Sequence, residues 1–217
     1  KATGPGAGIG GGFDDINETY DSGSGAIHIK GGTIEASSTL HGAGIGGSSA
    51  ALNCGPVTIS GGIVTAYGGT YCPGIGPGVD NHTWERGSAS QITISGGTVA
   101  ATGGDHGAGI GGAYVGVSSG TPVGPILISG GGVTASGKGG GAGIGGGRNG
   151  SGDQITISGG TVTATGSQDA AGIGGGYSGD SGQIRITGGT VLSSGGSGGA
   201  GIGCGRDRSN CCVIITG

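Results

Sequence analysis

The sequence predicts an all-β fold, a right-handed parallel β-helix (triangular β-solenoid), with about seven coils of 29–36 residues and three short strands per coil. Two observations lead to this prediction: Gly makes up 66 of the 217 residues, and a Gly-Ala-Gly-Ile-Gly-Gly unit recurs along the chain. Collagen would need Gly at every third position, and disorder would come with low hydrophobicity and high net charge. The chain has no three-residue period, is 32% hydrophobic and carries a net charge of only -4, so a solenoid repeat remains.

Each coil is expected to contain three strands joined by sharp corners. The Ile of the glycine-rich unit marks the coils and occurs at Ile9, Ile45, Ile75, Ile110, Ile144, Ile173 and Ile202. Between these units lie segments such as QITISGGTVTATG (from Gln154), in which apolar residues alternate on both sides of a Gly-Gly pair. This alternation predicts two strands with one buried face each, and the Gly-Gly pair predicts the corner between them. We assign a right-handed coil from the general preference of parallel crossovers.

The glycine-rich unit itself predicts the third strand, with Ala and Ile pointing inward. Its outward positions, such as Gly42, Gly44 and Gly46, carry no side chain. Gly in a strand often marks close approach by another backbone or a ligand, so this strip is a candidate for contact with a second solenoid or a flat sugar ring. The alternative is that these Gly residues only satisfy corner dihedral angles.

The combination of GAGIGGG and QITISGGTVTATG resembles the glycine-rich β-helix repeats of microbial cell-surface proteins. More distantly, it is similar to carbohydrate-binding β-helix domains with an Asp-Gly-Ile repeat. The resemblance implies an extracellular or cell-surface protein. In the carbohydrate-binding domains acidic residues beside the Gly-Ile contribute to calcium sites. The corresponding positions here are Ala7, Ala43, Pro73, Ala108, Ala142, Ala171 and Ala200, so we carry over no metal site.

Two surfaces are candidates for binding. The variable segments all follow the glycine-rich unit, and aromatic residues in them are candidates for stacking on glycans, or else they cover the core: Tyr20, Trp84, Tyr114 and Tyr177. Outward Thr and Ser residues on the strand after Gly-Gly resemble the arrays of ice-binding proteins, although Thr is also a good strand residue.

Sequons and cysteines point to an extracellular protein. The sequons begin at Asn17, Asn81 and Asn149, all in the variable segments, and we expect them to be glycosylated in a eukaryotic source. Cys204 and Cys211 bracket a short loop and are expected to form a disulfide. Another candidate pair is Cys54 and Cys72, in adjoining coils but at different corners. Cys212 is then left for an intermolecular bond or a free thiol.

Neither a catalytic set nor a cofactor motif is evident, and we expect the protein not to be an enzyme. GAGIGG fits a dinucleotide-binding pattern, but it recurs in every coil and strands follow it instead of a helix, so no cofactor is expected. The four His residues share no ligand spacing, so no metal is expected. Scattered Lys and Arg make no stripe for nucleic acid, and no apolar run is long enough to insert in a membrane.

We expect residues 1–217 to form a single β-solenoid domain, a fragment or protomer of a longer array. The opening KATG matches the end of one strand, and the closing CVIITG matches the strand that comes before it within a coil. The leading hypothesis is therefore an extracellular structural solenoid that forms or belongs to a surface fibre by head-to-tail or lateral self-association. The alternatives are a polysaccharide-binding or adhesive module and, third, an ice-binding protein.

Overall fold

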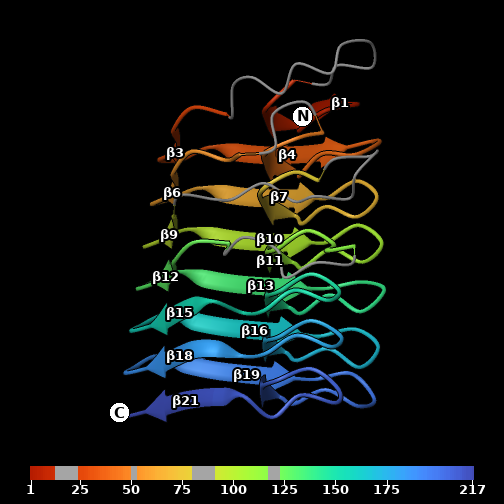
Figure 1. The fold of residues 1–217 in the computed structure, drawn as a ribbon. Helices are drawn as coiled ribbons and strands as arrows, with labels where there is room; N and C mark the ends of the chain where they lie inside the picture. The colour runs from red at the N-terminus through yellow and green to blue at the C-terminus, as the bar shows by residue number, and fades with distance from the viewer. Residues whose placement is uncertain (13–23, 50–52, 80–90, 117–122) are drawn as a thin grey trace.

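The structure is a computed structural model, and it describes residues 1–12, 24–49, 53–79, 91–116 and 123–217. In this part of the chain, 21 short strands form three seven-stranded sheets, and successive coils stack along one axis from the N-terminus to the C-terminus (Figure 1). Six coils have all three strands, β1 and β2 precede them, and β21 follows them. The all-β, three-sided parallel solenoid predicted from the sequence is confirmed.

We name the sheets by their place in each coil. Sheet 1 precedes the Gly-Gly corner and contains β3 (Ile27–Ile29), β6 (Val57–Ile59), β9 (Ile92–Ile94), β12 (Ile126–Ile128), β15 (Gln154–Ile157), β18 (Gly182–Ile186) and β21 (Cys211–Ile215). Sheet 2 follows that corner and contains β1 (Ala2–Gly4), β4 (Thr33–Ser38), β7 (Ile63–Tyr67), β10 (Thr98–Thr102), β13 (Gly132–Ser136), β16 (Thr161–Thr165) and β19 (Thr190–Ser194). Sheet 3 holds the glycine-rich units and contains β2 (Ile9–Gly10), β5 (Ile45–Gly46), β8 (Ile75–Gly76), β11 (Ile110–Gly111), β14 (Ile144–Gly145), β17 (Ile173–Gly174) and β20 (Ile202–Gly203).

Parallel pairing in register places equivalent residues of successive coils on top of one another. In sheet 2, for example, Val133 pairs with Val162 and Ala135 with Ala164. The inward residues of all three sheets therefore form continuous Ile, Val and Ala columns that make one core. In sheet 3 the Ile residues of the inner coils are fully buried. Burying one such side chain contributes about 1.5–3 kcal/mol, and this gain offsets the backbone entropy that the many Gly residues lose on folding.

The second Gly of the Gly-Gly pair forms the corner between sheets 1 and 2, as predicted. Gly131 and Gly160 have φ values of 85° and 87°, in the region that L-residues with a Cβ rarely adopt. A side chain at this position would strain the backbone in every coil.

The glycine strip of sheet 3 is not an exposed surface, and the hypothesis that it accepts a second solenoid or a sugar ring is wrong. Gly42, Gly44 and Gly46 are buried. A Cβ on Gly44 would lie only 2.6 Å from the Tyr67 backbone nitrogen and 2.7 Å from the Gly74 carbonyl oxygen. The close approach that the glycines permit is therefore between sheets 2 and 3 and between coils of the same chain.

Candidate functional site

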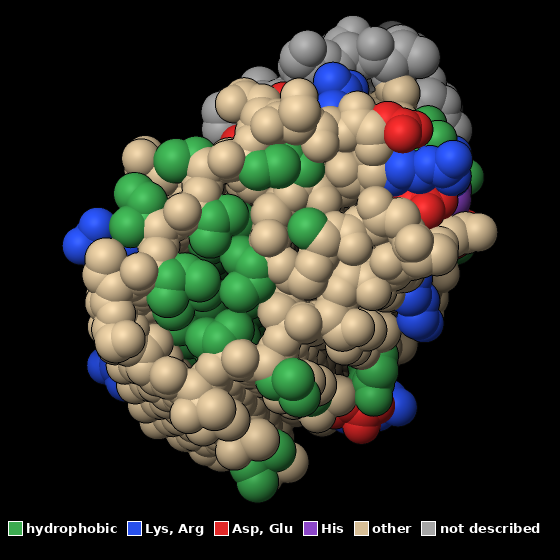
Figure 2. Space-filling view, turned by 90° about the horizontal axis from the view of Figure 1, so that it is seen from below, with side chains coloured by type: hydrophobic (Ala, Val, Ile, Leu, Met, Phe, Trp, Pro, Cys, Tyr) green, Lys and Arg blue, Asp and Glu red, His purple; other side chains and the backbone are tan. Residues whose placement is uncertain are grey.

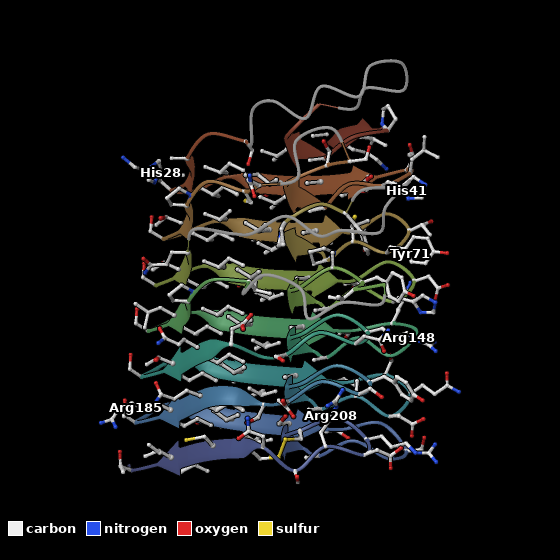
Figure 3. All side chains as sticks on the ribbon, viewed as in Figure 1. His28, His41, Tyr71, Arg148, Arg185 and Arg208 are labelled. Atoms are coloured by element: carbon white, nitrogen blue, oxygen red, sulfur yellow. A yellow bond between two sulfur atoms is a disulfide. The ribbon has the colours of Figure 1, made fainter. Side chains whose placement is uncertain are left out.

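One edge of the solenoid carries a regular double column of polar and aromatic residues. The columns consist of the residues four positions before and four positions after the Ile that opens each strand of sheet 3, and we call them together the edge ladder. The preceding column contains His41, Tyr71, His106, Gly140, Asp169 and Gly198; the following column contains Ser49, Val79, Tyr114, Arg148, Tyr177 and Arg206. In Figure 3, His41, Tyr71 and Arg148 lie along one edge, whereas Arg185 lies at the opposite edge.

Backbone hydrogen bonds join the two columns. The amide of a residue in the following column donates to the carbonyl of the preceding column one coil earlier, as in Tyr114 to Tyr71 (2.8 Å), Arg148 to His106 (2.9 Å), Tyr177 to Gly140 (2.8 Å) and Arg206 to Asp169 (2.8 Å). Because the same bond repeats over four successive coils, the fold sets the positions of these side chains.

Four rings form a connected aromatic cluster in the N-terminal half of the edge ladder. The rings of Tyr71 and His41 stack nearly parallel with centroids 6.1 Å apart. Tyr71 also contacts Tyr114 at 5.4 Å and His106 at 5.5 Å, and His106 contacts Tyr114 at 5.5 Å. All four residues are partly exposed. Such rings present flat apolar surface to solvent, which suits stacking on sugar rings.

The C-terminal half of the edge ladder carries cations. The guanidinium carbon of Arg148 lies 4.9 Å from the centre of the Tyr177 ring, within cation–π range. One coil further on, Arg206 pairs with Asp169 at 3.5 Å. Asp169 is the more buried of these two side chains, with 15% exposure against 54% for Arg206.

Three residues of the preceding column hold a backbone conformation that glycine would adopt without strain. Tyr71, His106 and Asp169 have φ values of 68°, 68° and 63°, and the equivalent residue Gly140 has a φ of 103°. A left-handed conformation costs a residue with a Cβ about 1–2 kcal/mol. Side chains kept at a position that favours glycine point to a role other than turn formation.

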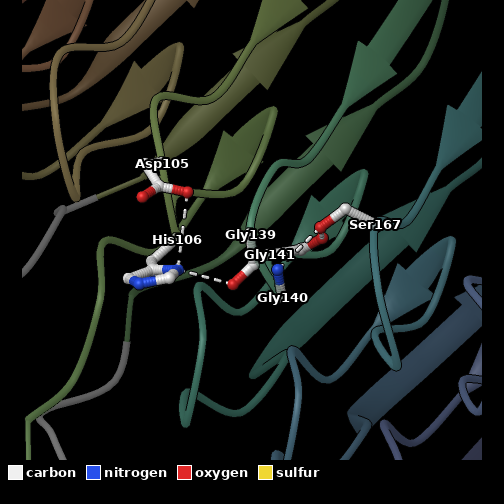
Figure 4. A network of polar contacts seen from close by, with 6 residues as sticks. All are labelled: Asp105, His106, Gly139, Gly140, Gly141 and Ser167. Atoms are coloured by element: carbon white, nitrogen blue, oxygen red, sulfur yellow. Dashed lines mark hydrogen bonds and ion pairs between the residues drawn. The ribbon is translucent and has the colours of Figure 1, made fainter.

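A polar network fixes the turn that carries Gly139 and Gly140 (Figure 4). His106 Nδ1 lies 2.6 Å from the Gly139 carbonyl oxygen, and because a carbonyl only accepts, Nδ1 carries the hydrogen. Asp105 Oδ1 lies 3.7 Å from the same Nδ1. The Gly140 amide donates to Ser167 Oγ at 2.8 Å. The turn is thus held from the coils on both sides.

A pocket of about 290 Å³ opens beside this turn. It is lined by Gly139, Gly140, Arg148, Gln168, Tyr177 and Arg206, together with Asp169. The pocket lies where Gly140 interrupts the preceding column, between the side chains of His106 and Asp169 on neighbouring coils. Among the described residues, no carboxylate pairs with Arg148, so its guanidinium has hydrogen-bond donors available to a ligand.

The structure places only part of the predicted site residues. Tyr114 and Tyr177 both belong to the edge ladder, whereas Tyr20 and Trp84 lie outside the described residues. The sequence interpretation missed His41, Tyr71 and His106 because they precede the glycine-rich unit. It missed Arg148 because only aromatic residues of the following segment were taken as binding candidates. The signal that could have identified them is their position, four residues before or after the Ile of each glycine-rich unit.

The sequon at Asn149 lies in a corner segment as predicted, next to Arg148. Its side-chain Nδ2 donates to the carbonyl oxygens of Val115 (3.0 Å) and Gly116 (3.3 Å). Nδ2 is also the atom that a glycan would occupy, so modification would remove at least one of these bonds. Asn17 and Asn81 lie outside the described residues, and glycosylation of all three stays a prediction.

The cysteine pairing is partly as expected. Cys204 and Cys211 form the predicted disulfide, with their Cα atoms 5.6 Å apart. The candidate pair of Cys54 and Cys72 is wrong: both are free and buried, Cys54 in the main core and Cys72 in a separate cluster with Val79. Burial raises the pKa of both thiols, that of Cys72 to about 12.

Cys212 is a free, exposed thiol on β21. Its backbone amide donates to Ser181 Oγ at 2.9 Å, which ties this end of the strand to the preceding coil. Whether Cys212 bonds to a partner stays a prediction.

The outer face of sheet 2 carries Thr and Ser columns, but apolar residues interrupt them. Ile63, Tyr67 and Leu192 are 55%, 44% and 67% exposed on this face. Leu192 stands in the same column as Thr163, and Ile63 in the same column as Thr98. Ala100 and Gly132 interrupt two of the three outward columns as well. Only one column keeps its hydroxyls over all the coils from β10 to β19, that of Thr102, Ser136, Thr165 and Ser194.

No three His, Cys, Asp or Glu side chains of the described part of the chain lie together in a way that would hold a metal ion. Among the same residues, no helix is long and apolar enough to span a membrane.

These features define a parallel β-solenoid that carries the edge ladder along one side. The β-helix repeat family matches more than half of the chain, over residues 1–13, 27–49, 57–79, 92–114, 126–148, 155–177 and 184–206. The chain therefore belongs to the β-helix repeat family. Each matched segment after the first begins at the first inward residue of a sheet 1 strand and ends at a residue of the following column of the edge ladder. No curated protein and no solved structure matches the chain significantly.

Proposed function

We propose that this protein is an extracellular, non-enzymatic structural solenoid that stacks head to tail into a surface fibre. The observation that carries the proposal is the apolar C-terminal face. Val213 and Ile215 of β21 continue the inward columns of Ile184 and Ile186, and they are 38% and 62% exposed. Figure 2 looks onto this face and shows hydrophobic side chains gathered in its middle. A second copy of the chain stacked on this face would cover these side chains.

The N-terminal face of a second copy has the strands to supply that coil. The last strands of sheets 2, 3 and 1 are β19, β20 and β21, and the first strands are β1, β2 and β3. Joining the two faces would therefore place β1, β2 and β3 of the second copy against β19, β20 and β21, so that all three parallel sheets continue. Contacts of this heterologous kind propagate into open filaments. The Cys204–Cys211 disulfide supports an oxidising, extracellular location.

A charge on the apolar end face tests this proposal. We expect Val213→Lys to reduce the high-molecular-weight fraction in sedimentation velocity, because the buried interface would then contain an unpaired cation. Leu192→Lys is the control, since Leu192 is also apolar and is more exposed than Val213 (67% against 38%) but lies on the outer face of sheet 2. A wild-type protein that sediments as a monomer over a wide concentration range would contradict head-to-tail stacking.

Polysaccharide binding is the second candidate, and the aromatic cluster of the edge ladder is the observation that favours it. Its four rings lie on three successive coils, which repeat about every 4.8 Å along the axis. This spacing is comparable to the length of one sugar unit in an extended polysaccharide. A glycan array tests this function directly. We expect wild-type binding and its loss in a Tyr71→Ala, Tyr114→Ala double variant, whereas absence of binding to all glycans would overturn it.

A further inference from the structure

We propose that the pocket at Gly140 binds the carboxylate of an acidic sugar within a polysaccharide that lies along the edge ladder. The inference rests on the polysaccharide-binding function proposed above and names the class of glycan. It is carried by the guanidinium of Arg148, held against the Tyr177 ring in a pocket that exists because Gly140 interrupts a column of side chains.

The preceding column has glycine at Gly140 and at Gly198, and only Gly140 lies between two coils that carry side chains at this position. The equivalent residues on the neighbouring coils are His106 and Asp169, and both keep side chains despite a strained φ. A Cβ on Gly140 would lie 3.1 Å from Tyr177 Cβ and 3.3 Å from Arg148 Cγ. Glycine therefore leaves room beside the arginine that any other residue would fill.

The backbone polar groups that line the gap already have partners, so recognition falls to the side chains. The Gly139 carbonyl accepts from His106, the Gly140 amide donates to Ser167, and the Gly140 carbonyl accepts from Tyr177. What remains for a ligand is the guanidinium of Arg148 and the exposed amide of Gln168, because Arg206 already pairs with Asp169 and Asp207. The Arg148 guanidinium only donates hydrogen bonds, so it calls for an acceptor and favours an anionic one, whereas the Gln168 amide can donate to the same ligand or accept from it.

The charge balance favours an anion although the chain as a whole is acidic. The lining holds two Arg and one Asp, a local charge of +1, whereas the whole protein carries -4. Arg206 is already paired with Asp169 and with Asp207, so Arg148 is the cation of this lining that has no carboxylate partner among the described residues. A planar guanidinium fits a planar carboxylate through two parallel hydrogen bonds, which a hydroxyl group cannot provide.

The aromatic cluster adjoins the pocket, so a ligand that contacts both must be long, and this favours a polymer over a single sugar. His106 belongs to the cluster and also donates to the Gly139 carbonyl at the pocket. A chain that stacks its neutral ring faces on Tyr114 and His106 would bring the next units over Arg148. Asp105 lies at the rim, in contact with the position that a Cβ on Gly139 would take, so its charge opposes an acidic ligand.

The test is calorimetric titration of the purified chain with oligogalacturonate and with the same oligosaccharide after reduction of its carboxyl groups to alcohols. We expect the acidic form to bind at least about tenfold more tightly, since a charge-assisted pair is lost in the reduced form. We also expect binding of the acidic form to weaken as salt is raised. Equal affinity for both forms would overturn the inference while leaving polysaccharide binding intact.

Matched variants locate the site. Arg148→Gln should lower affinity for the acidic oligosaccharide at least about tenfold, and Arg148→Lys should recover part of it. Arg185→Gln removes the same charge on the opposite edge and should leave affinity unchanged. Asp105→Asn should increase affinity. Thermal unfolding of each variant checks that it folds, and an Arg148→Gln variant that folds and binds like wild type would sink the proposal.

Two further outcomes separate the possible failures. If monomeric galacturonate binds as tightly as the oligosaccharide, the pocket is a site for small carboxylates and the polymer proposal is wrong. If neither the acidic nor the reduced oligosaccharide binds, both this inference and the polysaccharide-binding function are wrong.

Discussion

The guanidinium carbon of Arg148 lies 4.9 Å from the centre of the Tyr177 ring, although the two residues come from different coils. Both stand four positions after the first residue of a sheet 3 strand, and the pairing of Ile144 with Ile173 sets this register. The contact shows how the solenoid turns a sequence repeat into a line of touching side chains.

A double-mutant cycle on this pair should give a coupling energy of about 0.5–1 kcal/mol, as expected for a partly exposed cation–π contact. The single variants are Arg148→Gln and Tyr177→Leu, and urea unfolding gives the free energies. A coupling energy near zero would show that the two side chains do not hold each other in solution.

The glycines of sheet 3 should be far less replaceable than a glycine of sheet 2 in the same coil. A Cβ on Gly143 would lie 2.6 Å from the Thr165 backbone nitrogen, whereas a Cβ on Gly132 would meet nothing within 4 Å. We expect Gly143→Ala to destabilise by about 2–4 kcal/mol, because backbones must separate. Gly132→Ala should be neutral or stabilise by up to about 1 kcal/mol. Similar free energies of unfolding for the two variants would contradict the close packing of sheets 2 and 3.

The buried thiol of Cys72 should make stability fall in alkaline solution. Burial raises its pKa to about 12 from 9.0, so between these pH values the folded thiol keeps a proton that the unfolded thiol loses. Its contribution to stability is therefore complete below pH 9 and is lost at up to about 1.4 kcal/mol per pH unit above it. Urea unfolding from pH 8 to 11 measures this slope. Cys72→Ala should flatten it, and Cys212→Ala, at an exposed position, should not.

The three free cysteines should differ in how fast their thiols react with a reagent in solution. Cys212 is exposed, whereas Cys54 and Cys72 are buried and their raised pKa values keep them protonated at pH 8. We expect a disulfide reagent to modify one thiol in the native protein and three after unfolding in urea. One reactive thiol under both conditions would indicate that Cys54 and Cys72 are bonded after all.

Most of the fold could be predicted from the sequence because the repeat fixes register by itself. Once the Ile residues are aligned, alternation identifies the inward face of each strand, and parallel stacking leaves one arrangement of the columns. The prediction that the glycine strip is exposed was wrong, because it applied the alternation of inward and outward residues to a strand of only two residues. At Gly44 the outward direction leads to the neighbouring strand of sheet 2, not to solvent.

The candidate site was harder to predict because it depends on contacts between two corners. Tyr71 and Tyr114 are 43 positions apart, yet their rings lie 5.4 Å apart because a backbone bond joins the columns of successive coils. The sequence placed Tyr114 in a variable segment but gave no reason to pair it with Tyr71. The pocket at Gly140 forms because the preceding column has no side chain at this position. That gap can be recognised only when the coils are stacked in register.

Electron microscopy of the purified protein tests head-to-tail stacking most directly. If copies continue one another's sheets, filaments should form, and their averaged diffraction should show a reflection near 4.8 Å along the filament axis, which is the spacing of hydrogen-bonded strands. Particles of one short length would contradict the account, as would filaments in which the 4.8 Å reflection lies across the axis.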